Sequence, residues 1–224
     1  MPQKTRRPLP WIAVAAIAHH LALNMNLGAS LAWLLMVDGY LRPGECLDLK
    51  VSQVLPRTSK QFMRSVVLRL HPDERGIASK TGELEESLAI RRPWLAELIE
   101  TWWRSRRSED LWNFSLAELR KAFLSACRFY DLMQWRPVLY MGRHSGASLD
   151  RLTDALPLAE VQRRGRWRTE QSVRRYEKRS LIQEVYLKMR PDRRQAAERC
   201  ADQLLPLLRR MAGAQCGSKR RKPS

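Results

Sequence analysis

The chain opens with two apolar stretches separated by a short polar break. Residues 11–23 and 28–38 consist mostly of Ala, Leu, Ile, Val, Met and Trp, and the break between them carries Asn24 and Asn26. This spacing predicts two helices that pack together in the core. A membrane anchor would need a longer run without polar interruptions, so we expect buried helices here and no membrane association.

A β-type pattern follows further along the chain. Residues 39–54 predict a turn, a short helix and then a β-compatible stretch. Residues 65–71 and 86–90 are rich in branched and leucine side chains, and they predict two strands. The intervening residues 72–85 contain many turn-forming residues, so we expect a loop or irregular hairpin that carries Lys80 in a β-turn.

Helical spacing of apolar residues returns after the second strand. Residues 93–106 place leucine, isoleucine and tryptophan side chains on one helix face. Ser115 stands where it can cap a further helix, which we expect to run through Tyr130. The rest of the chain is predicted to be largely helical, with a basic amphipathic helix over residues 193–211 that Pro206 interrupts.

The charge of the chain indicates its class of partner. The 224 residues carry a formal net charge of +18, and the pI is near 10.7. A protein of this charge favours polyanions, because neutralising a phosphate backbone releases its counterions. We therefore expect a nucleic acid, double-stranded DNA first, as the partner.

The cysteines indicate the compartment. Their spacing is wide and irregular, and it matches neither a zinc site nor a disulfide framework; they are Cys46, Cys127, Cys200 and Cys216. We expect no metal and a reducing compartment, which is the nucleus in a eukaryote and otherwise the cytoplasm with its nucleoid. The basic cluster that begins at Lys219 fits either a nuclear import signal or a tail that grasps DNA.

The densest positive charge in the chain surrounds Tyr176. Residues 161–180 contain eight Lys and Arg residues against two Glu residues. Ionising a tyrosine near neutral pH needs positive neighbours, because its ordinary pKa is about 10. A phosphodiester that approaches the phenol needs cations as well. Taken alone, such a segment is more often a solvated helix face or an RNA-binding patch, so its meaning depends on residues elsewhere.

Several further residues complete an ordered pattern along the chain. They are Arg42 with Glu45 ahead of a Leu-x-Leu, Lys80 between the two strands, Arg143 with His144 at a helix start, and Trp167 nine residues before Tyr176. Each feature is weak alone, but in this order they resemble the catalytic domain of the tyrosine recombinases, the phage integrase family, over residues 11–188. The resemblance implies an α+β, mainly α-helical fold with a small antiparallel β-sheet or hairpin at one edge.

The resemblance also implies a reaction. Tyr176 would attack the phosphorus of a DNA strand and form a 3′-phosphotyrosyl bond, so that rejoining needs neither ATP, nor a metal, nor another cofactor. Arg42 and Arg143 would bind the non-bridging oxygens of that phosphate, because planar guanidiniums match phosphate geometry. Lys80 would protonate the departing 5′-oxygen as general acid.

Other residues receive supporting roles from the same resemblance. Trp167 would donate its indole N–H to the phosphate or pack behind the site, and Glu45 would orient Arg42 or neighbouring groups. Tyr140 stands where the family usually has His, or sometimes Lys; a tyrosine can donate a hydrogen bond but is a poor general base near neutral pH. Impaired activity is therefore an open alternative. His144 is expected to pack internally, although it is close enough to act in place of the missing base.

The organisation of the chain and its DNA contacts follow from the same comparison. We expect a basic N-terminal tail over residues 1–10, a catalytic domain over 11–190, and a basic C-terminal helix with a disordered tail over 191–224. Relatives usually carry an N-terminal clamp domain, and here only residues 1–10 precede the expected catalytic fold, which fits either a truncated gene product or a domain that does not encircle DNA. They assemble as homo-oligomers on DNA, where the C-terminal helix packs on a neighbouring protomer. The expected DNA contacts are Arg164, Arg166, Arg168, Arg174 and Arg175.

Two alternative functions remain open at this point. The first is a DNA-binding protein that keeps the fold but has lost the chemistry, which Tyr140 would allow. The second is a basic helical protein that binds RNA or scaffolds a partner, with the motifs arising by coincidence. Covalent capture of a nicked DNA separates strand transfer from both alternatives.

Overall fold

The computed structural model describes residues 7–58, 65–71, 86–174 and 179–217. In these ranges the α-helices are α1 (Trp11–Asn24), α2 (Leu27–Asp38), α3 (Pro43–Leu47), α4 (Pro93–Ser105), α5 (Leu116–Phe129), α6 (Met141–Leu152), α7 (Leu158–Gly165), α8 (Glu170–Arg174), α9 (Arg179–Lys188) and α10 (Pro191–Gly217). Two single turns of 3₁₀ helix are η1 (Val51–Gln53) and η3 (Met133–Trp135). The strands are β1 (Val54–Leu55), β2 (Val67–Leu70) and β3 (Glu86–Ala89).

The two apolar stretches form α1 and α2, as predicted, and they pack on each other in the core. Every residue of α2 is buried, which suits a helix whose circumference is apolar on all sides. Its start is fixed by Asn26, whose side-chain oxygen accepts the N–H of Ala29 at 2.9 Å. No helix in the described ranges is both long enough and apolar enough to cross a membrane.

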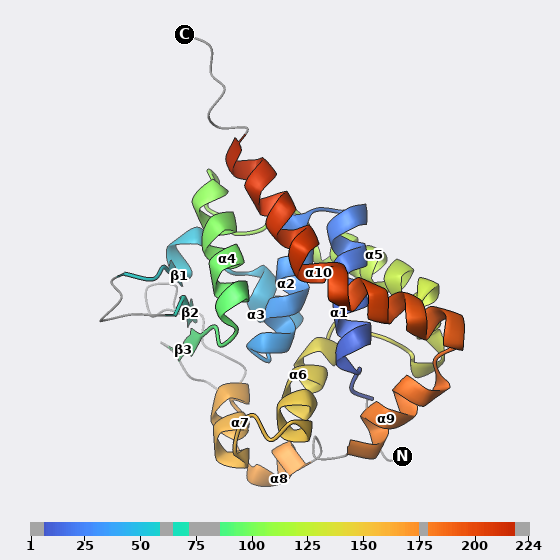
Figure 1. Cartoon of the computed structure of the whole chain (residues 1–224). Helices are drawn as coiled ribbons and strands as arrows, with labels where there is room; N and C mark the ends of the chain where they lie inside the picture. Colours follow the sequence, from blue (N-terminus) through green and yellow to red (C-terminus); the bar gives the residue numbers. More distant parts are fainter. Residues whose placement is uncertain (1–6, 59–64, 72–85, 175–178, 218–224) are drawn as a thin grey trace.

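The sheet is small and antiparallel, with strand order β1-β2-β3. Leu68 in the middle strand lies opposite Val54 on one side and Leu88 on the other. The sheet lies at one edge of the molecule, next to α4, and the other helices form the body (Figure 1). This arrangement confirms the predicted mainly helical α+β fold. The predicted turn with Lys80 lies outside the described residues.

The helix predicted after Ser115 is confirmed together with its cap. The Ser115 hydroxyl accepts the N–H of Glu118 at 3.2 Å, and the Glu118 carboxylate accepts the N–H of Ser115 at 2.7 Å. This reciprocal pair satisfies two backbone donors that the first turn of a helix leaves free. The resulting α5 packs against α1 on the side away from the sheet (Figure 1).

The prediction that Pro206 interrupts the last helix was wrong, because α10 runs from Pro191 to Gly217 without a break. A proline removes one backbone donor, yet its fixed φ is compatible with a helix. Burial of Leu204, Leu207 and Leu208 around it holds the helix against the core. In this chain α10 runs along α1 and also contacts α4 (Figure 1).

The residues just before α1 are part of the packed domain. Leu9 is fully buried, and its N–H donates to the hydroxyl of Ser145 at 2.8 Å. The described end of the expected N-terminal tail therefore lies against α6.

Candidate active site

The Arg42–Glu45 pair is held by the first turn of α3. Arg42 precedes the helix and Pro43 occupies its first position. The Glu45 carboxylate accepts the backbone N–H of Arg42 at 2.8 Å and its Nη1 at 2.5 Å. A carboxylate at this position also suits the positive end of the helix dipole. The three-residue spacing seen in the sequence thus places the two side chains in direct contact.

Glu45 has a second partner residue that the sequence did not indicate. Nη2 of Arg166 donates to the same carboxylate at 2.6 Å, and Nε of Arg166 lies 3.3 Å from Oε2 of Glu86. Burial alone would raise the pKa of Glu45, but the charge of Arg166, the N–H of Arg42 and the charges of Arg42 and Arg143 together hold it below its usual value. Glu45 is therefore a buried carboxylate stabilised in its ionised form.

Arg143 lies deepest in this group of charges. It is the third residue of α6, is 1% exposed, and donates through Nη1 to the carbonyl of Tyr40 and through Nη2 to the carbonyl of Gly165. Its Nε has no hydrogen-bond partner among the described residues. Burial lowers the pKa of Arg143 to about 10, and the nearby charges of Arg166 and Arg42 contribute to that lowering. The guanidinium still carries its proton at neutral pH.

Trp167 covers one face of Arg143. The Cζ atom of Arg143 lies 4.5 Å from the centre of the indole ring, and the centre of the Tyr40 ring lies 6.0 Å from the indole centre. Gly165 makes this position possible, since a Cβ there would lie 1.8 Å from the indole. Of the two roles suggested for Trp167, this geometry favours packing against the arginine, which is a cation–π contact.

Tyr140 and His144 lie next to each other at the start of α6. Tyr140 is the residue before the helix, and the two ring centres are 5.0 Å apart at 60°. Both side chains are half-buried. Tyr140 is close enough to Arg143 to act on its pKa, which it raises against the effect of burial. His144 thus packs on Tyr140 at the edge of the charged group.

Three of the expected site residues, Lys80, Arg175 and Tyr176, lie outside the described residues. The neighbouring described residues locate the ends of both gaps. Glu86, the first described residue after Lys80, contacts Arg166. On the other side, α8 ends at Arg174 and packs against α7, and α9 begins at Arg179 and contacts α6.

The arginines expected to bind DNA divide into two kinds. Arg168 and Arg174 are exposed, and Arg174 also pairs with Glu170 at 2.7 Å. Arg164 and Arg166 instead have largely buried side chains, 7% and 9% exposed. For these two, the structure differs from the exposed position expected of a DNA contact. The reason is that each meets a buried carboxylate, Asp38 for Arg164 and Glu45 for Arg166.

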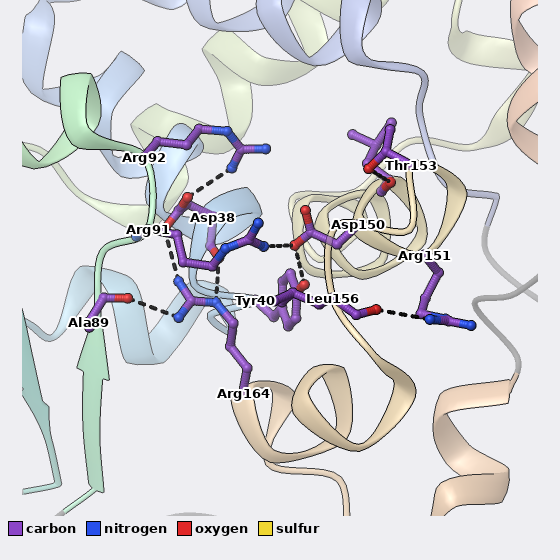
Figure 2. A network of polar contacts seen from close by, with 11 residues as sticks. Asp38, Tyr40, Ala89, Arg91, Arg92, Asp150, Arg151, Thr153, Leu156 and Arg164 are labelled. Carbon is purple, nitrogen blue, oxygen red and sulfur yellow. Dashed lines mark hydrogen bonds and ion pairs between the residues drawn. The ribbon is translucent and has the colours of Figure 1, made fainter.

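A buried polar network centred on Asp38 was not foreseen from the sequence. Asp38 accepts the backbone N–H of Arg91 at 3.0 Å, Nη1 of Arg92 at 2.8 Å and Nη2 of Arg164 at 2.9 Å (Figure 2). These bonds join α2, the segment after β3, and α7. One signal was available, because Asp38 is the only charged residue in the second apolar stretch. A buried charge must be paired.

A cavity adjoins this group of charged residues. Its volume is about 1010 Å³, and it lies between the sheet and α7. Glu86, Arg166 and Trp167 contribute to its wall, as do exposed Arg163 and Arg168. The charged group around Glu45 and Arg143 thus borders a space large enough for part of a ligand.

The fold is similar to solved structures of a DNA recombinase. One is the site-specific recombinase XerH bound to palindromic difH substrate in a post-cleavage complex, with a TM-score of 0.59 and 17% identity, and another is XerH with difH in a pre-cleavage complex, with 0.56 and 16%. Both matches cover 82% of this chain, which spans about half, 54% and 55%, of the length of those structures.

At this level of identity the similarity concerns the fold alone: over the matched residues, the chain folds like part of this site-specific recombinase. No protein-family model and no curated protein matches the sequence.

Proposed function

We propose that this chain cleaves and rejoins duplex DNA, with Tyr176 as the nucleophile. The phenol gives its proton to solvent water as its oxygen attacks the phosphorus. The bond to the 5′-oxygen breaks, and its electron pair leaves with that oxygen, which takes a proton from Lys80. The product is a 3′-phosphotyrosyl bond. Attack by a 5′-hydroxyl in the reverse direction restores the DNA strand and the free tyrosine.

The observation that carries this proposal is the environment of Arg143. Its buried Nε–H has no partner among the described residues, and a buried donor without a partner costs free energy that an anionic oxygen would recover. Arg42 lies near enough to affect the pKa of Arg143, and its side chain is 19% exposed. Two guanidiniums in one place, one of them accessible, suit a phosphate that carries two non-bridging oxygens.

Arg143 has to become accessible before it can bind a phosphate. The side chain is 1% exposed and the indole of Trp167 covers one of its faces. We propose that DNA binding displaces Trp167 far enough for a phosphate oxygen to reach the guanidinium, while the two backbone carbonyls keep holding its Nη atoms. Arg168 and Arg174, which are exposed on the same part of the chain, would contact the neighbouring DNA backbone.

A DNA-binding protein without cleavage activity is the second candidate. The burial of Arg143 favours it, because a guanidinium that never becomes accessible cannot stabilise a transition state. Tyr140, which replaces the usual base, favours it too. We propose assembly into a homo-oligomer on DNA only for the strand-transfer function, not for the DNA-binding protein without cleavage activity.

Covalent capture on nicked DNA separates the two candidates. A library of nicked duplexes with randomised sequence would be incubated with the wild-type chain and with Tyr176→Phe, and protein–DNA adducts would be isolated under denaturing conditions. We expect adducts with the wild type and none with Tyr176→Phe, because phenylalanine has no nucleophilic oxygen. Sequence-dependent binding without any adduct would favour the second candidate. Equal binding of structured RNA would contradict both.

A further inference from the structure

One face of α6 carries the site arginine and a buried acid two turns further along. Arg143, Gly146 and Asp150 follow each other at intervals of three and four residues, so they lie on the same side of the helix. Seven residues of helix separate Arg143 from Asp150 by about 10 Å. Asp150 is 4% exposed and therefore needs partners inside the protein.

Tyr40 spans this face from end to end. Its carbonyl accepts Nη1 of Arg143, its ring lies against Gly146, and its hydroxyl donates to the carboxylate of Asp150. A Cβ at Gly146 would lie 1.9 Å from the carbonyl oxygen of Val37 and 2.9 Å from the Tyr40 ring, so glycine lets both the backbone of α2 and the tyrosine approach α6. The same ring lies beside Trp167. Tyr40 is fully buried. Through these contacts it links Arg143 and Trp167 with Asp150, which lies near the far end of α6.

The backbone of Tyr40 is in the left-handed region, with φ at 49°. Residues other than glycine rarely adopt this conformation, so the side chain needs contacts that hold it there. Asp150 supplies one, and it is itself held by Nη1 of Arg91 at 2.5 Å (Figure 2). The ring also lies 5.8 Å from Cζ of Arg164. The hydroxyl–carboxylate bond is therefore placed to maintain the backbone turn that aims the Tyr40 carbonyl at Arg143.

We propose that Tyr40 is a positioning residue, anchored by Asp150, that orients the Arg143 guanidinium and the Trp167 ring. The inference rests on the proposed function, in which Arg143 binds the phosphate. With both Nη atoms fixed on carbonyls, the remaining N–H groups point in a set direction before DNA arrives. Such preorganisation lowers the barrier of a reaction without changing how tightly the substrate is held.

The test compares Tyr40→Phe with Tyr130→Phe. Each removes a single oxygen from a buried tyrosine, and the Tyr130 hydroxyl contacts Cys200 between α5 and α10, away from α6. The first measurement is the NMR spectrum of the Arg143 side-chain N–H groups, assigned by their loss in Arg143→Lys. In Tyr40→Phe we expect the Nη signals to shift and to exchange with water about tenfold faster, as loss of an ordering hydrogen bond predicts. In Tyr130→Phe they stay as in the wild type.

The second measurement separates catalysis from binding. In single-turnover reactions on nicked DNA selected by the wild type, Tyr40→Phe forms the adduct about tenfold more slowly, while the Kd for the same DNA changes less than about twofold. A merely structural defect would both slow adduct formation and raise the Kd. If the wild type forms no adduct, the proposed function fails and the NMR comparison alone decides the role of Tyr40.

Asp150→Asn keeps the size of the anchor and gives the same comparison should Tyr40→Phe not fold. If the Arg143 signals in Tyr40→Phe match those of the wild type, the positioning role is overturned. If Tyr40→Phe does not fold, the same result in Asp150→Asn overturns it. An adduct rate equal to that of Tyr130→Phe would also overturn it.

Discussion

The Glu45 carboxylate lies among several positively charged side chains and partly neutralises their charge. Arg42 and Arg166 bind it directly, and Arg143 lies near enough to lower its pKa. Guanidiniums brought this close repel one another, and the repulsion is strongest where water is excluded. One buried carboxylate between them offsets part of that repulsion. We therefore assign Glu45 an electrostatic role beyond the orientation of Arg42.

Replacing Glu45 by Gln is expected to destabilise the protein in a pH-dependent way. At neutral pH the loss is about 3 kcal/mol of unfolding free energy, since the partners of a buried charge pair are left without it. The pKa of Glu45 is lowered in the folded protein, so its contribution is present above the ordinary value of 4.5 and is lost as the pH falls below it. Urea denaturation at neutral pH and at about pH 3 measures the difference between wild type and Glu45→Gln, which should shrink at the lower pH.

Glu160→Gln serves as the control for that experiment. Glu160 is one-third exposed and pairs with the exposed Arg163, so its loss costs less than about 1 kcal/mol. A difference for Glu45→Gln that is equally large at both pH values would contradict the charge-based account and indicate a packing defect.

Neighbouring arginines show where prediction from sequence ends at this scale. Arg163 and Arg164 are adjacent, yet one is exposed and the other is buried on Asp38, which is 126 positions away. Helical periodicity predicts that the two arginines face different sides of α7. It does not predict the position of the Asp38 carboxylate, which depends on the tertiary structure. By contrast, the Arg42–Glu45 contact lies within one helical turn, and the resemblance to the recombinase motif had implied that Glu45 orients Arg42.

Among the elements, the helices were easier to predict than their partners. The apolar stretches fixed α1 and α2 to within a few residues, and Ser115 marked the start of α5. The predicted break at Pro206 was wrong, because burial of the leucines around it stabilises α10 by more than the low helix propensity of proline costs. Nothing in the sequence indicated that the residues before α1 would contact α9.

That contact joins the start of the described chain to the helix after Tyr176. Arg7 pairs with Glu184 of α9, and Glu184 also binds Lys188 at 2.6 Å. The ring of Trp135 receives both cations, with Cζ of Arg7 4.6 Å and Nζ of Lys188 5.7 Å from its centre. These contacts restrain α9, whose buried apolar residues are Ile182 and Val185, followed by Met189 just after the helix.

Arg7→Ala should therefore loosen α9. The backbone amides of α9 are expected to exchange hydrogen about two- to fivefold faster, because a partly exposed ion pair and a cation–π contact are lost. Hydrogen exchange followed by mass spectrometry measures this. Arg209→Ala, which removes an exposed ion pair between α10 and Glu97, is the matched control and leaves α9 unchanged. Equal exchange of α9 in both variants would show that Arg7 does not restrain it.

On the scale of the whole molecule, the fold was predicted correctly from the sequence. The mainly helical architecture with a small edge sheet is the one that the ordered motif implied, and two recombinase structures share it. The burial of Arg143 was not foreseen, because motif spacing says which residues meet and not how much water reaches them. The similarity covers about half of those structures and concerns the fold, so the chemistry must be tested on this chain.

The most direct test identifies the residue that carries DNA after cleavage. The denatured adduct is trimmed with nuclease and digested with protease, and mass spectrometry locates the remaining nucleotide. We predict a 3′-linked nucleotide on Tyr176 and on no other residue. A nucleotide on another side chain, or complete absence of an adduct from a protein that binds the same DNA, would contradict it.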